Sequence, residues 1–245
     1  MANLLVTDIE TIPNDAEKAL QPFLDSVKGD KRMSAFNQRD DADKKKGVAI
    51  EKAALSPVSA RILSIGILEV RNFDPLTCVG EEVPHFFSLF DMNEGEMLTE
   101  FDNLLGTVVH QSLVTFNGRS FDFPFMMFRA GILGIPGKFH MLPTGPYNGR
   151  DNHIDMFVHL NSISGLDKLY QYWNWIGLGK WVKALNLPFP KQDIGANLIE
   201  YFNKGDKQTV ETYNMEDVFN TYALLKRFSS NFDFTVRPSR SSGGF

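Results

Sequence analysis

Three short acidic motifs contain the residue types that could bind divalent metal ions. The first is Asp8-Ile9-Glu10, in which one residue separates two carboxylates at the end of the apolar run 4–6. Side chains alternate across a β-strand, so Asp8 and Glu10 should share one face while Ile9 points into the core. Neighbouring carboxylates repel each other unless a cation lies between them, so this pair is a candidate metal site. A solvated strand end is the alternative interpretation of so common a pattern.

Two further acidic motifs lie later in the chain. Asp122 follows a predicted strand at 113–116 and stands at the start of a predicted helix, where Asp commonly caps the N-terminus. In the last predicted helix, Tyr213 and Asp217 are about one turn apart, so they should face the same way. Taken alone, each motif is compatible with a purely structural role.

Hydrophobic patterning predicts an α/β fold whose strands and helices carry these motifs. Because Pro13 cannot donate to a strand ladder, residues 11–15 should form a turn. The short connection after the second strand predicts that the third strand runs antiparallel to it. Strands are predicted at 3–10, 61–70, 83–89, 113–116 and, as a short edge strand or turn, 152–156. Helices are predicted at 94–109, 124–131 closed by Gly131, 166–185, 194–204 and 209–228.

The pattern also predicts how the chain is organised along its length. We expect one domain over residues 1–228, with a charged helical insertion at about 16–55 and a flexible tail at 229–245. Within the insertion, the lysines 44–46 are predicted to form a solvated helix face and not a phosphate-binding patch. The aromatic residues around Trp173 are predicted to pack in the core and not to stack on bases.

Composition narrows the function classes. The net charge of −5 argues mildly against a broad basic face for nucleic acid, but not against a nucleic-acid enzyme whose acidic site is filled by cations. The single Cys78 excludes an intramolecular disulfide and a cysteine-based zinc site, and the five histidines lack metal-site spacing. Because no signal peptide or apolar run of about 18 residues is present, we expect an intracellular, cytoplasmic protein without a membrane partner.

In this order the three motifs resemble the signature of the DEDD superfamily of 3′–5′ exonucleases, which have an RNase H-like fold. The matching patterns are D-x-E at Asp8 to Glu10, N-x-x-x-F-D at Asn117 to Asp122, and Y-x-x-x-D at Tyr213 to Asp217. Tyr213 in the third motif resembles the tyrosine subclass of this superfamily and not the histidine subclass, which has a histidine there. Residues 165–169 and 213–222 further resemble the predicted exonucleases related to the proofreading domain of family B DNA polymerases. The resemblance implies an α/β RNase H-like mixed sheet flanked by helices.

The resemblance also implies a two-metal-ion mechanism with Mg²⁺ or Mn²⁺, for which carboxylates are suitable ligands. Asp8 would bridge both ions, Glu10 and Asp217 would complete the ion on the nucleophile side, and Asp122 would bind or orient the second ion. Tyr213 would hydrogen-bond the attacking water.

Four further residues would contact the substrate by the same resemblance. Asn117 and Phe121 would position the terminal nucleotide, while Thr11 and Ile12 would supply backbone and apolar contacts. The segment around Asp155 also resembles a family segment, but we expect that carboxylate to make structural hydrogen bonds.

The expected substrate is the 3′ end of single-stranded or frayed DNA, and we expect the protein either to act alone or to serve a polymerase or repair complex in trans. An exoribonuclease of the same fold is one alternative, since no residue can be assigned to the sugar 2′-hydroxyl. A catalytically silent nucleic-acid-binding module is the other.

Overall fold

The protein is built on a five-stranded mixed sheet. The computed structural model describes residues 2–14, 49–50, 52–74, 77, 79–107, 111–142, 153–162, 176–192 and 194–229. The strand order is β3-β2-β1-β4-β5, antiparallel from β3 to β1 and parallel from β1 to β5. The strands are β1 (Ala2–Pro13), β2 (Ala60–Asp74), β3 (Val79–Ser88), β4 (Gln111–Thr115) and β5 (His153–Asp155). The predicted mixed sheet, including its antiparallel third strand and short edge strand, is therefore confirmed.

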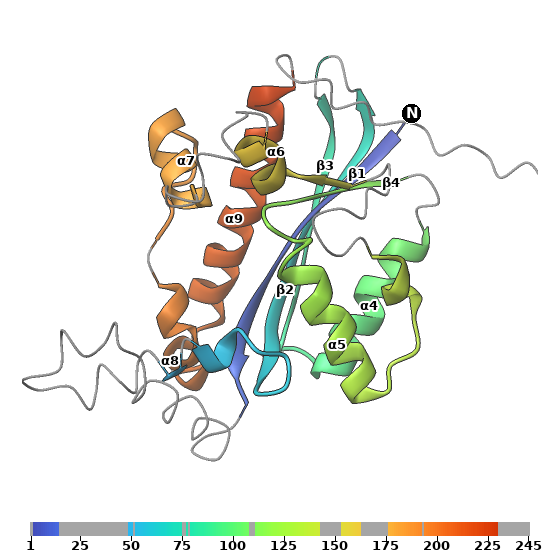
Figure 1. Ribbon diagram of the computed structural model, residues 1–245, viewed down its shortest axis with the longest axis vertical. Helices are drawn as coiled ribbons and strands as arrows, with labels where there is room; N and C mark the ends of the chain where they lie inside the picture. Colours follow the sequence, from blue (N-terminus) through green and yellow to red (C-terminus); the bar gives the residue numbers. More distant parts are fainter. Residues whose placement is uncertain are drawn as a thin grey trace, which may run out of the picture.

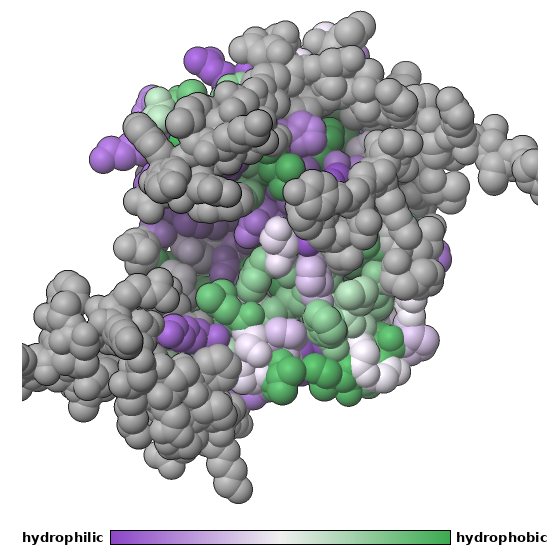
Figure 2. All heavy atoms as spheres, viewed as in Figure 1, coloured by the Kyte–Doolittle hydropathy of each residue, from purple (hydrophilic) through white to green (hydrophobic). Residues whose placement is uncertain are grey.

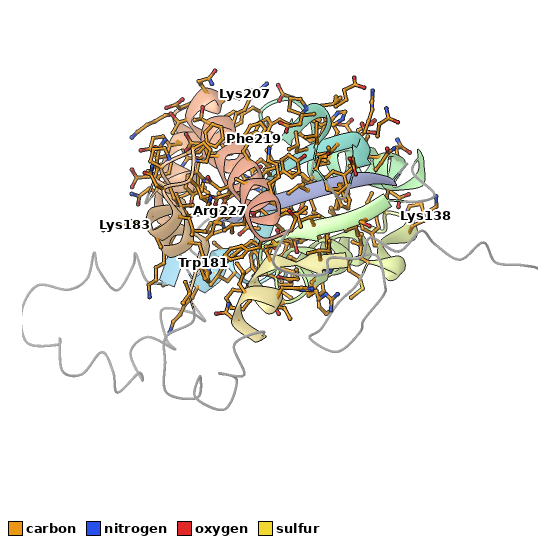
Figure 3. The ribbon with its side chains drawn as sticks, turned by 90° about the horizontal axis from the view of Figure 1, so that it is seen from above. Lys138, Trp181, Lys183, Lys207, Phe219 and Arg227 are labelled. Atoms are coloured by element: carbon orange, nitrogen blue, oxygen red, sulfur yellow. The ribbon has the colours of Figure 1, made fainter. Side chains whose placement is uncertain are left out.

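Helices cover both faces of the sheet (Figure 1). One face packs against α4 and α5, and the other against α6, α7 and the long α9. Seen from above, α7 with Trp181 lies beside α9 (Figure 3), and the Trp181 ring is 5.8 Å from that of Phe228. The helices are α4 (Glu94–Thr107), α5 (Asp122–Leu133), η1 (Lys138–Met141), α6 (Met156–Ser162), α7 (Leu178–Leu185), η3 (Gly195–Asn197), α8 (Leu198–Asn203) and α9 (Lys207–Phe228).

Strand β1 is the central strand, and its alternation fixes where each acidic residue lies. Leu4 and Val6 belong to the core on the α9 side, whereas Leu5 and Ile9 belong to the core on the α4 and α5 side. Because side chains alternate with a period of two, Asp8 continues the row that faces α9. The apolar part of the strand therefore directs the acidic residues at its end towards the last helix.

The turn between β4 and α5 uses the special backbone of an Asn-Gly pair. Asn117 adopts a left-handed conformation with φ 72°, which Asn tolerates better than most residues. A Cβ on Gly118 would lie 2.5 Å from Oγ1 of Thr115, so only glycine fits there. This tight turn places the start of α5 next to the end of β1.

The structure corrects several predicted boundaries, among them the end of the second strand, which lies at Asp74 and not at 70, and the start of the third strand, which lies at Val79 and not at 83. The turn predicted at 11–15 does not form within the described residues, because β1 continues through Pro13. The register of β1 against β2 shifts between Glu10 and Thr11, and Pro13 then lies opposite Ala60. Proline is tolerated there because β4 pairs with β1 only as far as Val6. Helix α5 also ends later than predicted, with Gly134 at φ 67° in place of Gly131.

Several sequence predictions fall outside the described residues. They concern Cys78, Trp173, most of the insertion at 16–55, and the tail from residue 230. Of the helix predicted at 166–185, the structure describes α7 at its C-terminal end.

The outer face of α5 carries exposed apolar side chains. Phe128, Ile132 and Leu133 are 56%, 54% and 40% exposed, and Figure 2 shows hydrophobic side chains gathered over this part of the surface.

Of the helices in the described ranges, none is long and apolar enough to cross a membrane.

A buried ion pair joins α4 to α5 and to the sheet. Arg129 donates to both carboxylate oxygens of Glu94, at 2.8 and 2.6 Å, and the Ile62 N–H donates to Oε1 of Glu94 at 2.8 Å. Both charged side chains are less than a tenth exposed. Loss of one partner would leave the other charge buried without compensation.

We therefore predict that Arg129→Met lowers the free energy of unfolding by about 3–5 kcal/mol. The matched control is Lys204→Met, because Lys204 pairs with Glu200 on the surface and is 69% exposed. That control should cost less than about 1 kcal/mol. Urea denaturation measures both, and equal losses in the two variants would contradict the structural role of the buried pair.

Candidate metal centre

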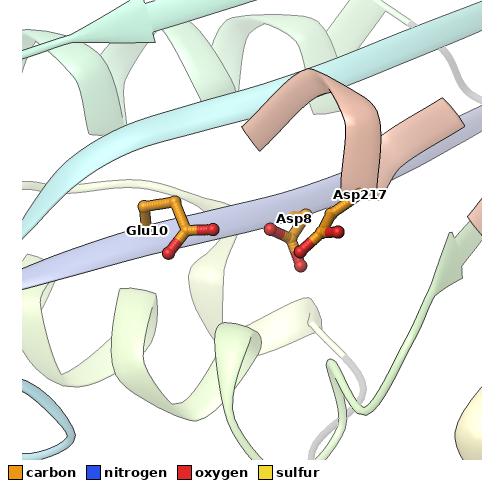
Figure 4. Close-up of side chains that lie close together, drawn as sticks. All are labelled: Asp8, Glu10 and Asp217. Carbon is orange, nitrogen blue, oxygen red and sulfur yellow. The ribbon is translucent and has the colours of Figure 1, made fainter. Parts of the chain in front are cut away.

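Three carboxylates converge where β1 meets α9. Asp8 and Glu10 come from the strand and Asp217 from the helix, and one oxygen of each lies within 4.8 Å of the others. Figure 4 shows the three side chains pointing into one small volume. Hard oxygen ligands at this spacing suit a divalent cation. The structure thus brings together residues that are more than 200 positions apart in the chain.

Asn214 holds Asp8 in place. Its Nδ2 donates to Oδ2 of Asp8 at 2.9 Å, and its Oδ1 accepts from Oγ of Ser64 at 3.1 Å. Asn214 is fully buried. A side chain at position 66 would collide with it, because a Cβ added to Gly66 would lie only 2.8 Å from Oδ1 of Asn214. Sequence reasoning assigned no role to Asn214. The sequence feature that could have identified Asn214 is its position three residues before Asp217, because this spacing puts both residues on one helix face.

Asp122 does not cap its helix, contrary to the simplest interpretation of its position. It is the first residue of α5, after Phe121, and its Oδ1 accepts the Ile9 N–H at 3.0 Å. Because β4 pairs with β1 only as far as Val6, this buried N–H needs another acceptor. The carboxylate is 3% exposed and lies near enough to Asp8 to raise the pKa of that residue.

Asp155 makes structural hydrogen bonds, as predicted. It is fully buried, and its carboxylate accepts from the backbone N–H groups of Asn117 at 2.9 Å and Arg119 at 3.0 Å. Arg119 in turn donates to Nδ1 of His153 at 2.9 Å. Burial and the nearby Arg119 lower the pKa of His153 to about 2, so its ring is neutral and can accept. These contacts fix the turn that carries Asp122.

Burial and mutual repulsion make the ionised carboxylates unfavourable without a cation. Burial first, and then the charges of Asp122, Glu10 and Asp217, raise the pKa of Asp8 well above its ordinary value. Burial and Asp217 raise the pKa of Glu10 to about 8. Burial raises the pKa of Asp122 to about 7 and also raises that of Asp217. A bound divalent ion would offset this cost.

The side chain of Asp217 fits the role of a metal ligand. It is 5% exposed, and Oδ1 has no hydrogen-bond partner within the described ranges. Oδ2 pairs with Nζ of Lys191, a residue that sequence reasoning did not identify. Buried polar atoms are rarely left unpaired, so the free oxygen is a position where a ligand would be expected.

A pocket of about 310 Å³ lies beside the carboxylates. Its lining includes five of the predicted site residues: Glu10, Thr11, Ile12, Phe121 and Tyr213. Asn117 is not among the lining residues. It lies in the turn between β4 and α5.

Tyr213 and Asp217 lie on the same side of α9, as predicted, since Lys191 contacts both. A Cβ on Gly195 would lie 2.9 Å from the Tyr213 hydroxyl, so the absence of a side chain at Gly195 makes room for it. Tyr213 therefore reaches the border between the pocket and the carboxylates.

A family model described as "predicted 3′-5′ exonuclease related to the exonuclease domain of PolB" matches residues 55–234. The chain therefore belongs to this family. The match includes Asn117 to Asp122 and Tyr213 to Asp217 but begins after β1, so the structure alone places Asp8 and Glu10 beside them. A search of curated proteins gave no match.

Among solved structures, the chain is similar to the family B DNA polymerase from the hyperthermophilic archaeon Pyrobaculum calidifontis. The TM-score is 0.56 with 14% sequence identity, over 93% of this chain and 24% of that one. The chain thus spans about a quarter of the polymerase's length. This likeness confirms the predicted RNase H-like fold.

The raised carboxylate pKa values predict an unusual pH dependence for the metal-free protein. Glu10, with a pKa of about 8 against an ordinary 4.5, holds its proton more tightly when folded than when unfolded. Stability should therefore fall as the pH rises from about 5 to about 8. Thermal unfolding with chelator at pH 5.5, 7 and 8.5 tests this, and Glu10→Gln should flatten the trend. A midpoint that rises over this range would contradict the assignment.

Proposed function

We propose that the protein is a metal-dependent 3′–5′ exonuclease that hydrolyses phosphodiester bonds at the 3′ end of DNA, with single-stranded or frayed ends preferred. The observation that supports this best is the convergence of Asp8, Glu10 and Asp217 within 4.8 Å beside a pocket that Tyr213 lines. Family membership supports the same reaction class. A polymerase or repair complex acting in trans is the partner we propose.

The carboxylates would hold two divalent cations, Mg²⁺ or Mn²⁺. Asp8, Glu10 and Asp217 supply the converging oxygens, and Asp122, anchored on the Ile9 N–H, supplies charge at the edge of the site. When bound, the ions would activate the attacking water and neutralise the leaving oxygen. The oxygen of the attacking water would bond to phosphorus while the bond from phosphorus to the 3′-oxygen of the preceding nucleotide breaks. That oxygen would take up a proton and become the new 3′-hydroxyl, and a 5′-mononucleotide would be released.

The remaining site residues would position the 3′ end. Phe121 lines the pocket and offers a ring face on which a terminal base can stack. The Thr11 hydroxyl already donates to the Ala54 carbonyl at 2.7 Å, so Thr11 would contact substrate through its backbone. Ile12 is almost fully buried and forms part of the pocket lining. The Tyr213 hydroxyl would orient the attacking water.

Oligonucleotides labelled at the 5′ end test this proposal. The full chain is incubated with single-stranded DNA, blunt duplex DNA and single-stranded RNA, each with Mn²⁺ and with chelator. We expect a descending ladder on single-stranded DNA that requires metal, and slower cleavage of the duplex, because unpairing an end costs a few kcal/mol. A ladder on RNA alone would identify an exoribonuclease, and binding without cleavage would identify a silent module.

Asp8→Asn should abolish cleavage while leaving the fold intact. The amide keeps an acceptor for Asn214 but removes a charge that the metal site needs. We expect a loss of at least about 100-fold, since even outer partners of a metal site contribute 10- to 100-fold. The midpoint of thermal unfolding without metal should stay equal or rise, because repulsion is relieved. Glu200→Gln, a surface carboxylate change, is the control, and equal activity in the two variants would refute the assignment.

Tyr213→Phe isolates the proposed role of one hydroxyl. The ring would stay in place, so Mn²⁺ binding measured by thermal shift should not change. The single-turnover cleavage rate should fall by roughly 10- to 1000-fold for one lost transition-state contact. Tyr201→Phe on α8 serves as the control. If the Tyr213 variant cleaves as fast as the parent protein, its hydroxyl has no part in the reaction.

A further inference from the structure

A segment outside the three acidic motifs forms part of the pocket beside the carboxylates. Ile50, Ala54 and Leu55 line the pocket from the stretch of chain that leads into β2. Leu55 is 57% exposed, although the nearby Ala53 is fully buried. The proposed reaction gives this part of the lining no role.

The lining is apolar wherever it is not part of the reaction centre. Among the described residues that line the pocket, only Glu10, Thr11 and Tyr213 have polar side chains. Glu10 and Tyr213 serve the proposed reaction, and the Thr11 hydroxyl already donates to the Ala54 carbonyl at 2.7 Å. The other lining residues offer surface for packing, but no side-chain group that could read the edge of a base through hydrogen bonds.

Hydrogen bonds to two other elements fix the turn that carries Leu55. The hydroxyl of Thr11 in β1 donates to the carbonyl of Ala54, the residue directly before Leu55. Two residues after Leu55, the Pro57 carbonyl accepts from Nη1 of Arg129 in α5 at 2.9 Å. Leu55 is thus held at the border of the pocket before any ligand binds, which reduces the entropy that binding would cost.

The position of Leu55 distinguishes it from an ordinary exposed apolar side chain. Single exposed leucines and valines are common on proteins, and Val58 is such a residue, because it is 79% exposed on the same turn but does not line the pocket. Leu55 borders the pocket that Glu10 also lines, and Glu10 belongs to the carboxylate cluster. A phosphate at the carboxylates would therefore place the adjoining nucleotide within reach of Leu55.

We propose that Leu55 is a specificity-determining residue, which packs with Phe121 on the base of the 3′-terminal nucleotide, whichever of the four bases that is. The proposal rests on the proposed function, because it takes the 3′ end of DNA as the substrate. A leucine side chain and an aromatic ring both offer apolar surface to the face of a base, and every base has such a face. The pocket then selects an unpaired base without selecting its identity.

Removal of the Leu55 side chain should weaken DNA binding without slowing the chemical step. In single-turnover cleavage of single-stranded DNA, Leu55→Ala should raise the half-saturating protein concentration about 5-fold, since about half of an apolar side chain is left for the base to cover. The maximal rate and the midpoint of thermal unfolding should not change. Leu55→Met should restore most of the lost affinity. Val58→Ala is the matched control on the same turn and should behave like the parent protein.

A strand without a terminal base separates a contact with that base from a general effect on the site. The same single-stranded DNA, labelled at the 5′ end, is prepared with an abasic residue at the 3′ end. The difference between the parent protein and Leu55→Ala should disappear on this strand, because neither protein can then contact a base. A 5-fold difference that persists on the abasic strand would overturn the proposal. Intact strands that end in each of the four bases should all lose affinity to a similar extent, and a loss confined to one base would contradict selection without identity.

The failure of this proposal can be distinguished from the failure of the proposed function. If the parent protein cleaves DNA and Leu55→Ala has the same half-saturating concentration, the contact with the base fails alone. If the parent protein does not cleave, the proposed reaction fails, and the same comparison is made as equilibrium binding by fluorescence anisotropy. Weaker binding by Leu55→Ala that is seen only with an intact terminal base would still support the contact, whereas equal binding by the two proteins would overturn it as well.

Discussion

Repulsion among buried carboxylates is the constraint on which the rest of the site depends. Asp8, Glu10 and Asp217 approach within 4.8 Å, and burial raises the pKa of each. Carboxylates in such positions either take up protons, pair with a cation or bind metal. The protein combines these solutions, because it has raised pKa values, a lysine on Asp217, and one carboxylate oxygen with no partner among the described residues.

The fold holds the carboxylates together through contacts that are mainly with backbone groups and neutral amides. Asn214 fixes Asp8, and the unpaired N–H of Ile9 beyond the end of β4 fixes Asp122. Asp155 accepts four backbone N–H groups and so fixes the turn before α5. None of these contacts needs a metal. The site is therefore largely preorganised, which reduces the cost of gathering its ligands when cations bind.

The sequence was sufficient to predict the strand that carries Asp8 and Glu10, because alternation is a local property of any buried strand. The position of Tyr213 and Asp217 on the same side of one helix followed equally directly from helical spacing. The turn predicted at Pro13 was wrong, since a strand can end in proline where its neighbour has already ended. The role of Lys191 could not be predicted, because its contact joins two segments 26 residues apart and depends on how α7 packs against α9.

The central claim is that the cluster binds divalent cations, and anomalous diffraction from crystals soaked in MnCl₂ tests it most directly. We predict an anomalous difference peak among the carboxylate oxygens of Asp8, Glu10 and Asp217. Crystals with intact carboxylates, full Mn²⁺ access and no peak at this position would contradict it.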